Sequence, residues 1–204
     1  MIIKNSLVTL LVVASLSGCG AKDDSGSSAG PVSDADGNWS STCADLSIPG
    51  VVTSSTKSSY AVASGQAITT AGIYSDAACT NVATLYVLTS TFTTGNAVTA
   101  PSGAKEFNGK ATSMTITLNT DEAVADANDG EDKICSGGFV KGQAKTLTAA
   151  DCPNDKSFND SYNIYKVDGT KLFIGDCGDS GTATDCSAPT KRPTTLPEAF
   201  FTKA

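Results

Sequence analysis

The stretch Thr112-Ser113-Met114-Thr115-Ile116-Thr117-Leu118 decides the fold class, because hydroxyl and apolar side chains alternate in it from Ser113 onward. A period of two places Met114, Ile116 and Leu118 on one face of an extended strand and the hydroxyl residues on the other face. A strand with one apolar and one polar face is typical of an antiparallel sheet that covers a core on one side. The stretch therefore predicts an antiparallel β-sheet protein.

Other segments extend this pattern over the chain. Residues 82–92 alternate in the same way, and residues 162–167 and 171–174 flank Asp168-Gly169, a pair that favours a tight hairpin. Further strands are predicted near 38–43, 58–64, 66–74 and 137–141, with one short helical turn at 121–127. About eight short strands favour an all-β fold, either an antiparallel barrel of about eight strands or, as the alternative, a β-sandwich.

The amino terminus carries a targeting signal. Lys4 precedes an apolar run over residues 7–16, which has the length of a signal peptide and is too short to span a bilayer. The run ends in Leu16-Ser17-Gly18-Cys19, which resembles the lipobox of bacterial lipoproteins. The resemblance implies that residues 1–18 are removed and that Cys19 is lipidated, so that several acyl chains anchor the protein. A secretory signal with a chance cysteine is the alternative.

Gly20 follows Cys19, and by resemblance to enterobacterial sorting patterns this residue favours the outer membrane over the inner membrane. We therefore expect a lipid-anchored protein of a bacterial cell envelope. Residues 20–37 are rich in Gly, Ser and Asp, so residues 19–37 are predicted to be the lipidated cysteine and a flexible tether. One β domain is then expected over residues 38–204. The chain carries a net charge of −7, which disfavours nucleic acid as a partner.

Six further cysteines lie in the expected domain. An even number of cysteines in an exported chain favours disulfides over metal ligation, and the chain contains no histidine and no CxxC pair. Six cysteines allow fifteen pairings, and the short loops between neighbouring cysteines favour one of them. The predicted pairs are Cys43–Cys79, Cys135–Cys152 and Cys177–Cys186.

The absence of histidine also bears on catalysis. Gly178-Asp179-Ser180-Gly181 matches the string around the nucleophile of trypsin-like proteases, but no imidazole is available as its general base. We interpret the string as a polar loop and expect neither an enzyme nor a cofactor. The acidic segment 121–132 and the series Asp34, Asp36, Asn38 and Asp45 lack the EF-hand spacing, so no calcium or other metal site is predicted.

A family resemblance appears at the start of the domain. Gly37-Asn38-Trp39 lies where lipocalins carry Gly-x-Trp, and Cys43, residues 74–76, Cys79, residues 172–176 and Arg192-Pro193 complete an arrangement that resembles lipocalin-like bacterial lipoproteins. The Thr-Asp-Tyr motif usual in lipocalins is absent. The resemblance implies that Arg192 packs across Trp39 to close the barrel, and that a ligand would contact inward side chains. The inward side chains expected to contact such a ligand are Tyr60, Tyr86, Phe92, Met114, Ile116 and Phe173.

Two classes of function follow from these expectations. The first is a membrane-anchored lipoprotein whose barrel binds or carries a small hydrophobic or amphipathic ligand. The second is a structural or interaction module with a filled core that displays loops such as 119–134 and 176–190. The apolar tail over residues 193–204 is expected to cover a sheet edge.

Overall fold

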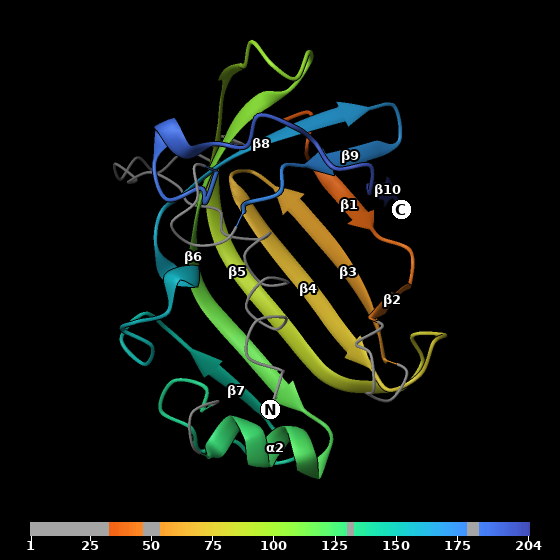
Figure 1. Ribbon diagram of the computed structural model, residues 1–204, viewed down its shortest axis with the longest axis vertical. Helices are drawn as coiled ribbons and strands as arrows, with labels where there is room; N and C mark the ends of the chain where they lie inside the picture. The colour runs from red at the N-terminus through yellow and green to blue at the C-terminus, as the bar shows by residue number, and fades with distance from the viewer. Residues whose placement is uncertain (1–32, 47–53, 130–132, 179–183) are drawn as a thin grey trace, which may run out of the picture.

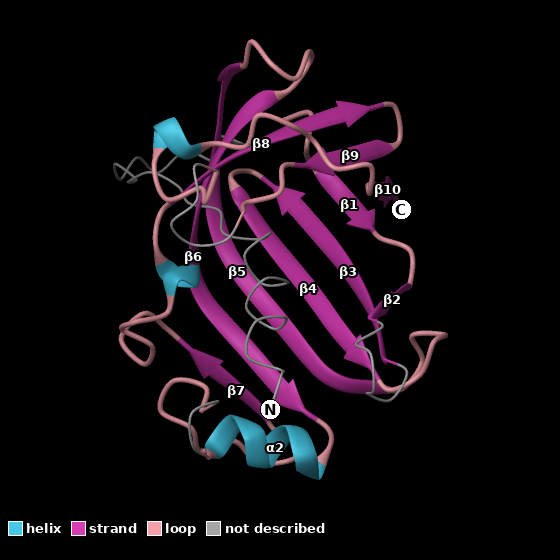
Figure 2. Ribbon diagram, in the orientation of Figure 1, coloured by secondary structure: helices cyan, strands magenta, loops and turns pink. Residues whose placement is uncertain are grey.

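The computed structural model describes residues 33–46, 54–129, 133–178 and 184–204. These residues form ten strands, one α-helix and two 3₁₀ turns (Figure 2). The strands are β1 (Gly37–Ser40), β2 (Ala44–Leu46), β3 (Ser54–Ala63), β4 (Gln66–Tyr74), β5 (Val82–Ala97), β6 (Lys105–Leu118), β7 (Ala144–Leu147), β8 (Ser161–Asp168), β9 (Lys171–Ile174) and β10 (Phe201–Lys203). The helix is α2 (Asp121–Asn128), and the 3₁₀ turns are η3 (Lys156–Phe158) and η4 (Pro189–Lys191).

Eight of the strands form a closed antiparallel ring. The sheet runs from β1 through β10, β9, β8, β6, β5 and β4 to β3, and β3 pairs again with β1. Because the sheet closes on itself, the predicted barrel is confirmed and the alternative sandwich is wrong. Every neighbouring pair is antiparallel, as the alternation in β6 indicated.

The ring closes over only part of the length of its longest strands. β6 pairs with β8 through Lys105–Gly109 and with the short strand β7 through Met114–Thr117. Likewise, β3 pairs with β1 near its carboxyl end and with β2 near its amino end. In Figure 1, β8 and β9 cross the upper part of the molecule, while β3 to β6 continue below them towards α2. The barrel therefore has a closed upper half and a sheet extension below it.

The interior is organised in rows of side chains that the strand register aligns. One row crosses the barrel through Trp39, Tyr60, Thr69, Leu88 and Met114, and all five residues are buried. Met114, Ile116 and Leu118 all face the core, as the alternation predicted. The sequence pattern thus gave the correct buried face for β6.

One predicted strand is wrong. Residues 137–141 form a loop because Gly137 and Gly138 adopt φ of +67° and +76°, which an extended strand does not allow. Asn128 fixes this loop by donating from Nδ2 to the Phe139 carbonyl and accepting from the Phe139 amide, at 2.9 and 2.8 Å. The strand of this region is β7 instead. The helical turn predicted at 121–127 is confirmed as α2, which begins after Thr120, whose hydroxyl caps the Ala123 amide.

Both ends of the described chain belong to the barrel. The fold starts earlier than the predicted boundary at residue 38, because Gly37 already lies in β1 and Ala35 is buried in the core. At the other end, the tail contributes β10, which pairs with β9 on one side and β1 on the other. The tail therefore does more than cover an edge, since it supplies the strand that closes the ring.

Three disulfides brace the loops, and they are the three predicted pairs. Cys43–Cys79, Cys135–Cys152 and Cys177–Cys186 have Cα–Cα distances of 5.9, 4.8 and 5.4 Å. The first ties the segment between β1 and β2 to the loop between β4 and β5, and the other two close short loops beside β7 and β8.

Candidate functional site

Trp39 lies at the barrel end where the chain enters. Its side chain is 1% exposed, and its Nε1 donates to the carbonyl of Ala35 at 2.8 Å. The cation over its ring is Lys203, whose Nζ lies 5.2 Å from the ring. Gly37 makes room for this lysine, because a Cβ at Gly37 would lie 3.0 Å from Cε of Lys203. The Gly-x-Trp pattern thus has a packing role here.

Arg192 does not occupy this position, so the prediction that it packs across Trp39 is wrong. Its guanidinium lies 5.5 Å from the ring of Tyr162, on the outer face of β8, and donates to the Asn163 carbonyl at 2.7 Å and to Asn108. A carboxylate oxygen of Glu106 lies 3.7 Å away. Arg192 therefore fastens the segment after η4 to the outside of β6 and β8. β10 supplies the basic residue at Trp39 instead.

Asp34 ties the amino-terminal arm to the same barrel end. The hydroxyl of buried Tyr165 donates to Asp34 Oδ1 at 2.5 Å, and Lys105 Nζ donates to Oδ2 at 2.7 Å. Partial burial raises the pKa of Asp34, but the hydrogen bonds from Lys105 and Tyr165 outweigh it and hold the pKa below its ordinary value. Burial and the Asp34 carboxylate together raise the pKa of Tyr165. The arm is therefore a fixed part of the upper end.

One side of the interior is lined with hydroxyl groups. We refer to the inward-facing hydroxyl residues of β3, β4 and β5 as the hydroxyl wall; they are Thr56, Ser58, Tyr60, Thr69, Thr84, Tyr86 and Ser90. The next strand of the sheet, β6, instead presents Met114, Ile116 and Leu118. The interior therefore has a polar, uncharged side and an apolar side.

Several groups of the hydroxyl wall have no hydrogen-bond partner among the residues that the structure describes. These groups are the buried hydroxyls of Thr56, Thr69 and Ser90. Thr69 is 5% exposed and Ser90 is fully buried. An unpaired buried hydroxyl costs about 1–3 kcal/mol, so a polar partner for these three groups would be stabilising.

Access to the interior differs between the two halves. At the upper end, the large side chains of Trp39, Tyr60, Phe107 and Tyr165 are buried and fill the closed ring. Towards the lower end, the inward-facing positions of β3 and β4 are only half-buried and carry small or medium side chains. These positions are Thr56, Ser58, Ala71 and Ile73. Solvent therefore reaches the inner face at the lower end of β3 and β4.

The structure places five of the six predicted inward residues inside. Tyr60, Tyr86, Phe92, Met114 and Ile116 are all buried members of the core. Phe173 lies on the outer face instead, because its neighbours Leu172 and Ile174 are the inward-facing residues of β9. Its ring contacts exposed Phe200 with a centroid distance of 5.7 Å. The prediction for Phe173 was wrong.

A second candidate lies on the rim of the barrel beside the β3–β4 turn. This rim pocket has a volume of about 290 Å³ and is lined by Gly37, Asn38, Ala61, Val62, Ala63, Gln66 and Ile68. None of these residues is charged, and Ile68 is 46% exposed. The volume lies at the lower limit for a ligand pocket, which is about 300 Å³.

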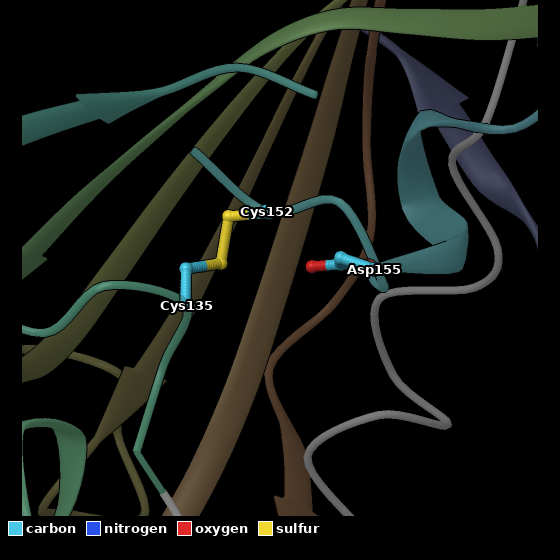
Figure 3. Close-up of side chains that lie close together, drawn as sticks. All are labelled: Cys135, Cys152 and Asp155. Atoms are coloured by element: carbon cyan, nitrogen blue, oxygen red, sulfur yellow. A yellow bond between two sulfur atoms is a disulfide. The ribbon is translucent and has the colours of Figure 1, made fainter. Parts of the chain in front are cut away.

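One group of potential metal-ligating atoms occurs in the described part of the chain, and it has a simpler explanation. Figure 3 shows the Cys135–Cys152 disulfide with the side chain of Asp155 beside it. The two sulfurs are bonded to each other, and Asp155 accepts from the amide of Ser157 at 2.8 Å as the cap of η3. The cluster therefore reflects a disulfide next to a capped turn.

Some predicted features fall outside the described residues. These are Cys19 with the signal and tether segments up to residue 32, Asp179-Ser180-Gly181 of the protease-like string, and part of the acidic segment, residues 130–132. Asn128, in the described part of that segment, makes both of its side-chain hydrogen bonds to the backbone of Phe139.

The chain matches no protein-family model and no curated protein. None of the helices in the described ranges is long and apolar enough to cross a bilayer.

Proposed function

We propose that this protein is a lipid-anchored, non-enzymatic component of a bacterial cell envelope, whose barrel binds or carries a small hydrophobic or amphipathic molecule. The observation that carries the proposal is the hydroxyl wall, with buried unpaired hydroxyls at Thr69 and Ser90 next to the apolar inner face of β6. A ligand with polar and apolar parts would satisfy these hydroxyls while burying its hydrocarbon against β6. The half-buried lower positions of β3 and β4, Ser58 and Ala71, mark the side from which a ligand would approach these hydroxyls.

Co-purification tests the binding proposal. The protein is isolated from its own envelope, and native mass spectrometry and lipid extraction are used to find a bound small molecule. We expect a stoichiometric ligand, and a rise in melting temperature when it or a hydrophobic dye is added back. Recovery of no ligand, together with no thermal shift from fatty acids, neutral lipids or dyes, would rule out the binding function.

Matched substitutions locate the bound molecule. Thr69→Val and Ser90→Ala should weaken binding, because each removes a hydroxyl of the wall with little change in volume. Thr70→Val is the control, since Thr70 lies on the same strand but faces outward. Ile68→Ser reports on the rim pocket; a loss of binding in this variant alone would move the site to the rim.

The proposed anchor rests on Leu16-Ser17-Gly18-Cys19, as in bacterial lipoproteins, and it predicts membrane attachment through acyl chains on Cys19. Cys19→Ser should release the protein from membranes. Mass spectrometry should detect acyl chains on the parent protein and none on the variant. A Cys19→Ser variant that still sediments with membranes would contradict the anchor but not the ligand site.

A structural or interaction module is the second candidate. It is favoured by the filled upper core and by Val140, which is 53% exposed at the tip of the loop that Asn128 holds in place. In this case Val140→Ser should abolish capture of a partner protein while leaving the melting temperature unchanged. An unchanged interaction profile would remove the support for this candidate.

A further inference from the structure

The distribution of charge around the interior limits the chemistry of a ligand. Between Ser58 and Ala104 the chain contains one charged residue, Asp76. Asp76 lies in the loop after β4, where its carboxylate accepts from the amides of Ala78, Thr80 and Asn81. Strands β4 and β5 therefore contribute no charge to either face of the barrel.

Below the barrel rim, the inward-facing positions of β3 and β6 are also uncharged. Along β3 they are Thr56, Ser58, Tyr60 and Val62, and along β6 Glu106 and Lys110 alternate with the buried residues. Lys105 lies on the same face as Phe107, but it is at the upper end of β6, where its ammonium donates to Asp34. Burial raises the pKa of both Tyr60 and Tyr86, so these phenols stay neutral at physiological pH. Below Lys105, four adjacent strands thus form an inner surface without a formal charge.

Two further lysines among the described residues border this surface, and both are engaged elsewhere. Lys203 lies at the rim with its ammonium over Trp39. Lys145 of β7 donates to the Gly137 carbonyl, with the Ser136 hydroxyl at 3.4 Å and the ring of Phe139 at 5.1 Å. Neither ammonium is aimed at the hydroxyl wall.

A buried carboxylate or phosphate without a cation is strongly disfavoured, whereas hydroxyl, ester and ether groups can pair with Ser and Thr side chains. We infer that the barrel selects neutral amphiphiles, with one hydrocarbon chain and hydroxyl or carbonyl groups, and rejects their anionic counterparts. The polar groups would bind Thr69 and Ser90, and the chain would lie along β6. This inference rests on the proposed function and names the ligand class of the same site.

The test compares two probes that share one hydrocarbon chain, lauric acid and its glycerol monoester. Trp39 is the single tryptophan and lies beside Tyr60 in the interior register, so its fluorescence reports binding. The titrations use the full chain carrying Cys19→Ser, so that acyl chains on the protein do not contribute. At neutral pH we expect the monoester to bind at least about tenfold more tightly than laurate. The preference should shrink as the pH falls towards about 5 and laurate becomes protonated.

A charge swap provides the matched variant. Thr56 faces inward and its neighbour Lys57 faces outward, so Thr56→Lys with Lys57→Thr moves one positive charge from the outer to the inner face at constant composition. We expect this double variant to bind laurate at least about tenfold more tightly than the unswapped chain does. Lys57→Thr alone is the control and should leave both affinities unchanged. Circular dichroism and the melting temperature verify that the swap folds.

The outcomes separate the two claims. Equal affinities for the two probes in the unswapped chain, or tighter binding of laurate, would overturn the neutral selectivity while leaving the binding function intact. Binding of neither probe, together with no co-purified ligand, would overturn the proposed function itself. The comparison in the unswapped chain decides the inference even if the swapped variant does not fold.

Discussion

The two phenylalanines of the carboxyl-terminal tail provide a direct test of how the barrel closes. Phe201 begins β10, packs edge-on against Tyr60 with a centroid distance of 4.6 Å, and is half-buried. Phe200 precedes it, is 38% exposed, and lies outside the barrel beneath Lys171, whose Nζ is 4.1 Å from the ring. Replacing each by alanine removes the same atoms, from the inner side of the barrel at Phe201 and from its outer side at Phe200.

The expected losses differ because the two rings have different surroundings. Phe→Ala in a full core costs about 3–5 kcal/mol, so half-buried Phe201 should cost roughly 2–3 kcal/mol. For a chain of this length that corresponds to a fall in melting temperature of roughly 4–12 °C. Phe200→Ala removes an exposed cation–π contact and should cost about 1 kcal/mol or less.

Urea denaturation and differential scanning calorimetry of both variants measure these free energies of unfolding. Trp39 fluorescence supplies a second reading, because β10 also carries the lysine over Trp39. Only Phe201→Ala should change the emission of the folded state. Equal losses for the two variants, or a larger loss for Phe200→Ala, would refute the insertion of β10 between β9 and β1.

Three further changes probe other parts of the barrel. Asp34→Asn should lower the melting temperature at neutral pH. Because the folded pKa of Asp34 is depressed, the difference in melting temperature between this variant and the parent should shrink and then vanish as the pH falls below about 4. Cys43→Ser with Cys79→Ser should lower the free energy of unfolding by about 2–4 kcal/mol, and reductant should then have less effect on the variant's urea midpoint than on the parent's. Gly37→Ala places a Cβ at φ +141° against Lys203, so its melting temperature should fall by an amount equivalent to about 1–3 kcal/mol and recover only in part when Lys203→Ala is added.

The features that could be predicted from sequence are those with local signals. Alternation along residues 112–118 gave the fold class and the buried face of β6, and short spacings gave the pairing of Cys135 with Cys152 and of Cys177 with Cys186. The same alternation placed Leu172 and Ile174 together, which was the available signal that Phe173 faces outward. The prediction that Phe173 faces inward did not follow this period.

The features that could not be predicted depend on long-range register. β10 has three residues, too few to show a period of two, and only its pairing with β1 brings Lys203 beside Trp39. Arg192 is nearer to Trp39 in the chain, yet its position after η4 takes it to the outer face of β8. The hydroxyl wall was likewise hidden, because its members are scattered over three strands and align only after pairing.

The seam between β1 and β10 joins the two ends of the chain, and it is held by few backbone pairs. Only Trp39 with Lys203 and Ser40 with Thr202 are paired across it, whereas β5 and β6 share a long ladder. Side chains compensate for the short ladder: the Trp39 ring, the Phe201–Tyr60 contact and the bonds of Asp34 all lie at this end. Because each short strand alone is marginal, closure of the ring depends on these contacts forming together. The concentration of aromatic and charged contacts at this end therefore follows from a barrel that closes where its chain begins and ends.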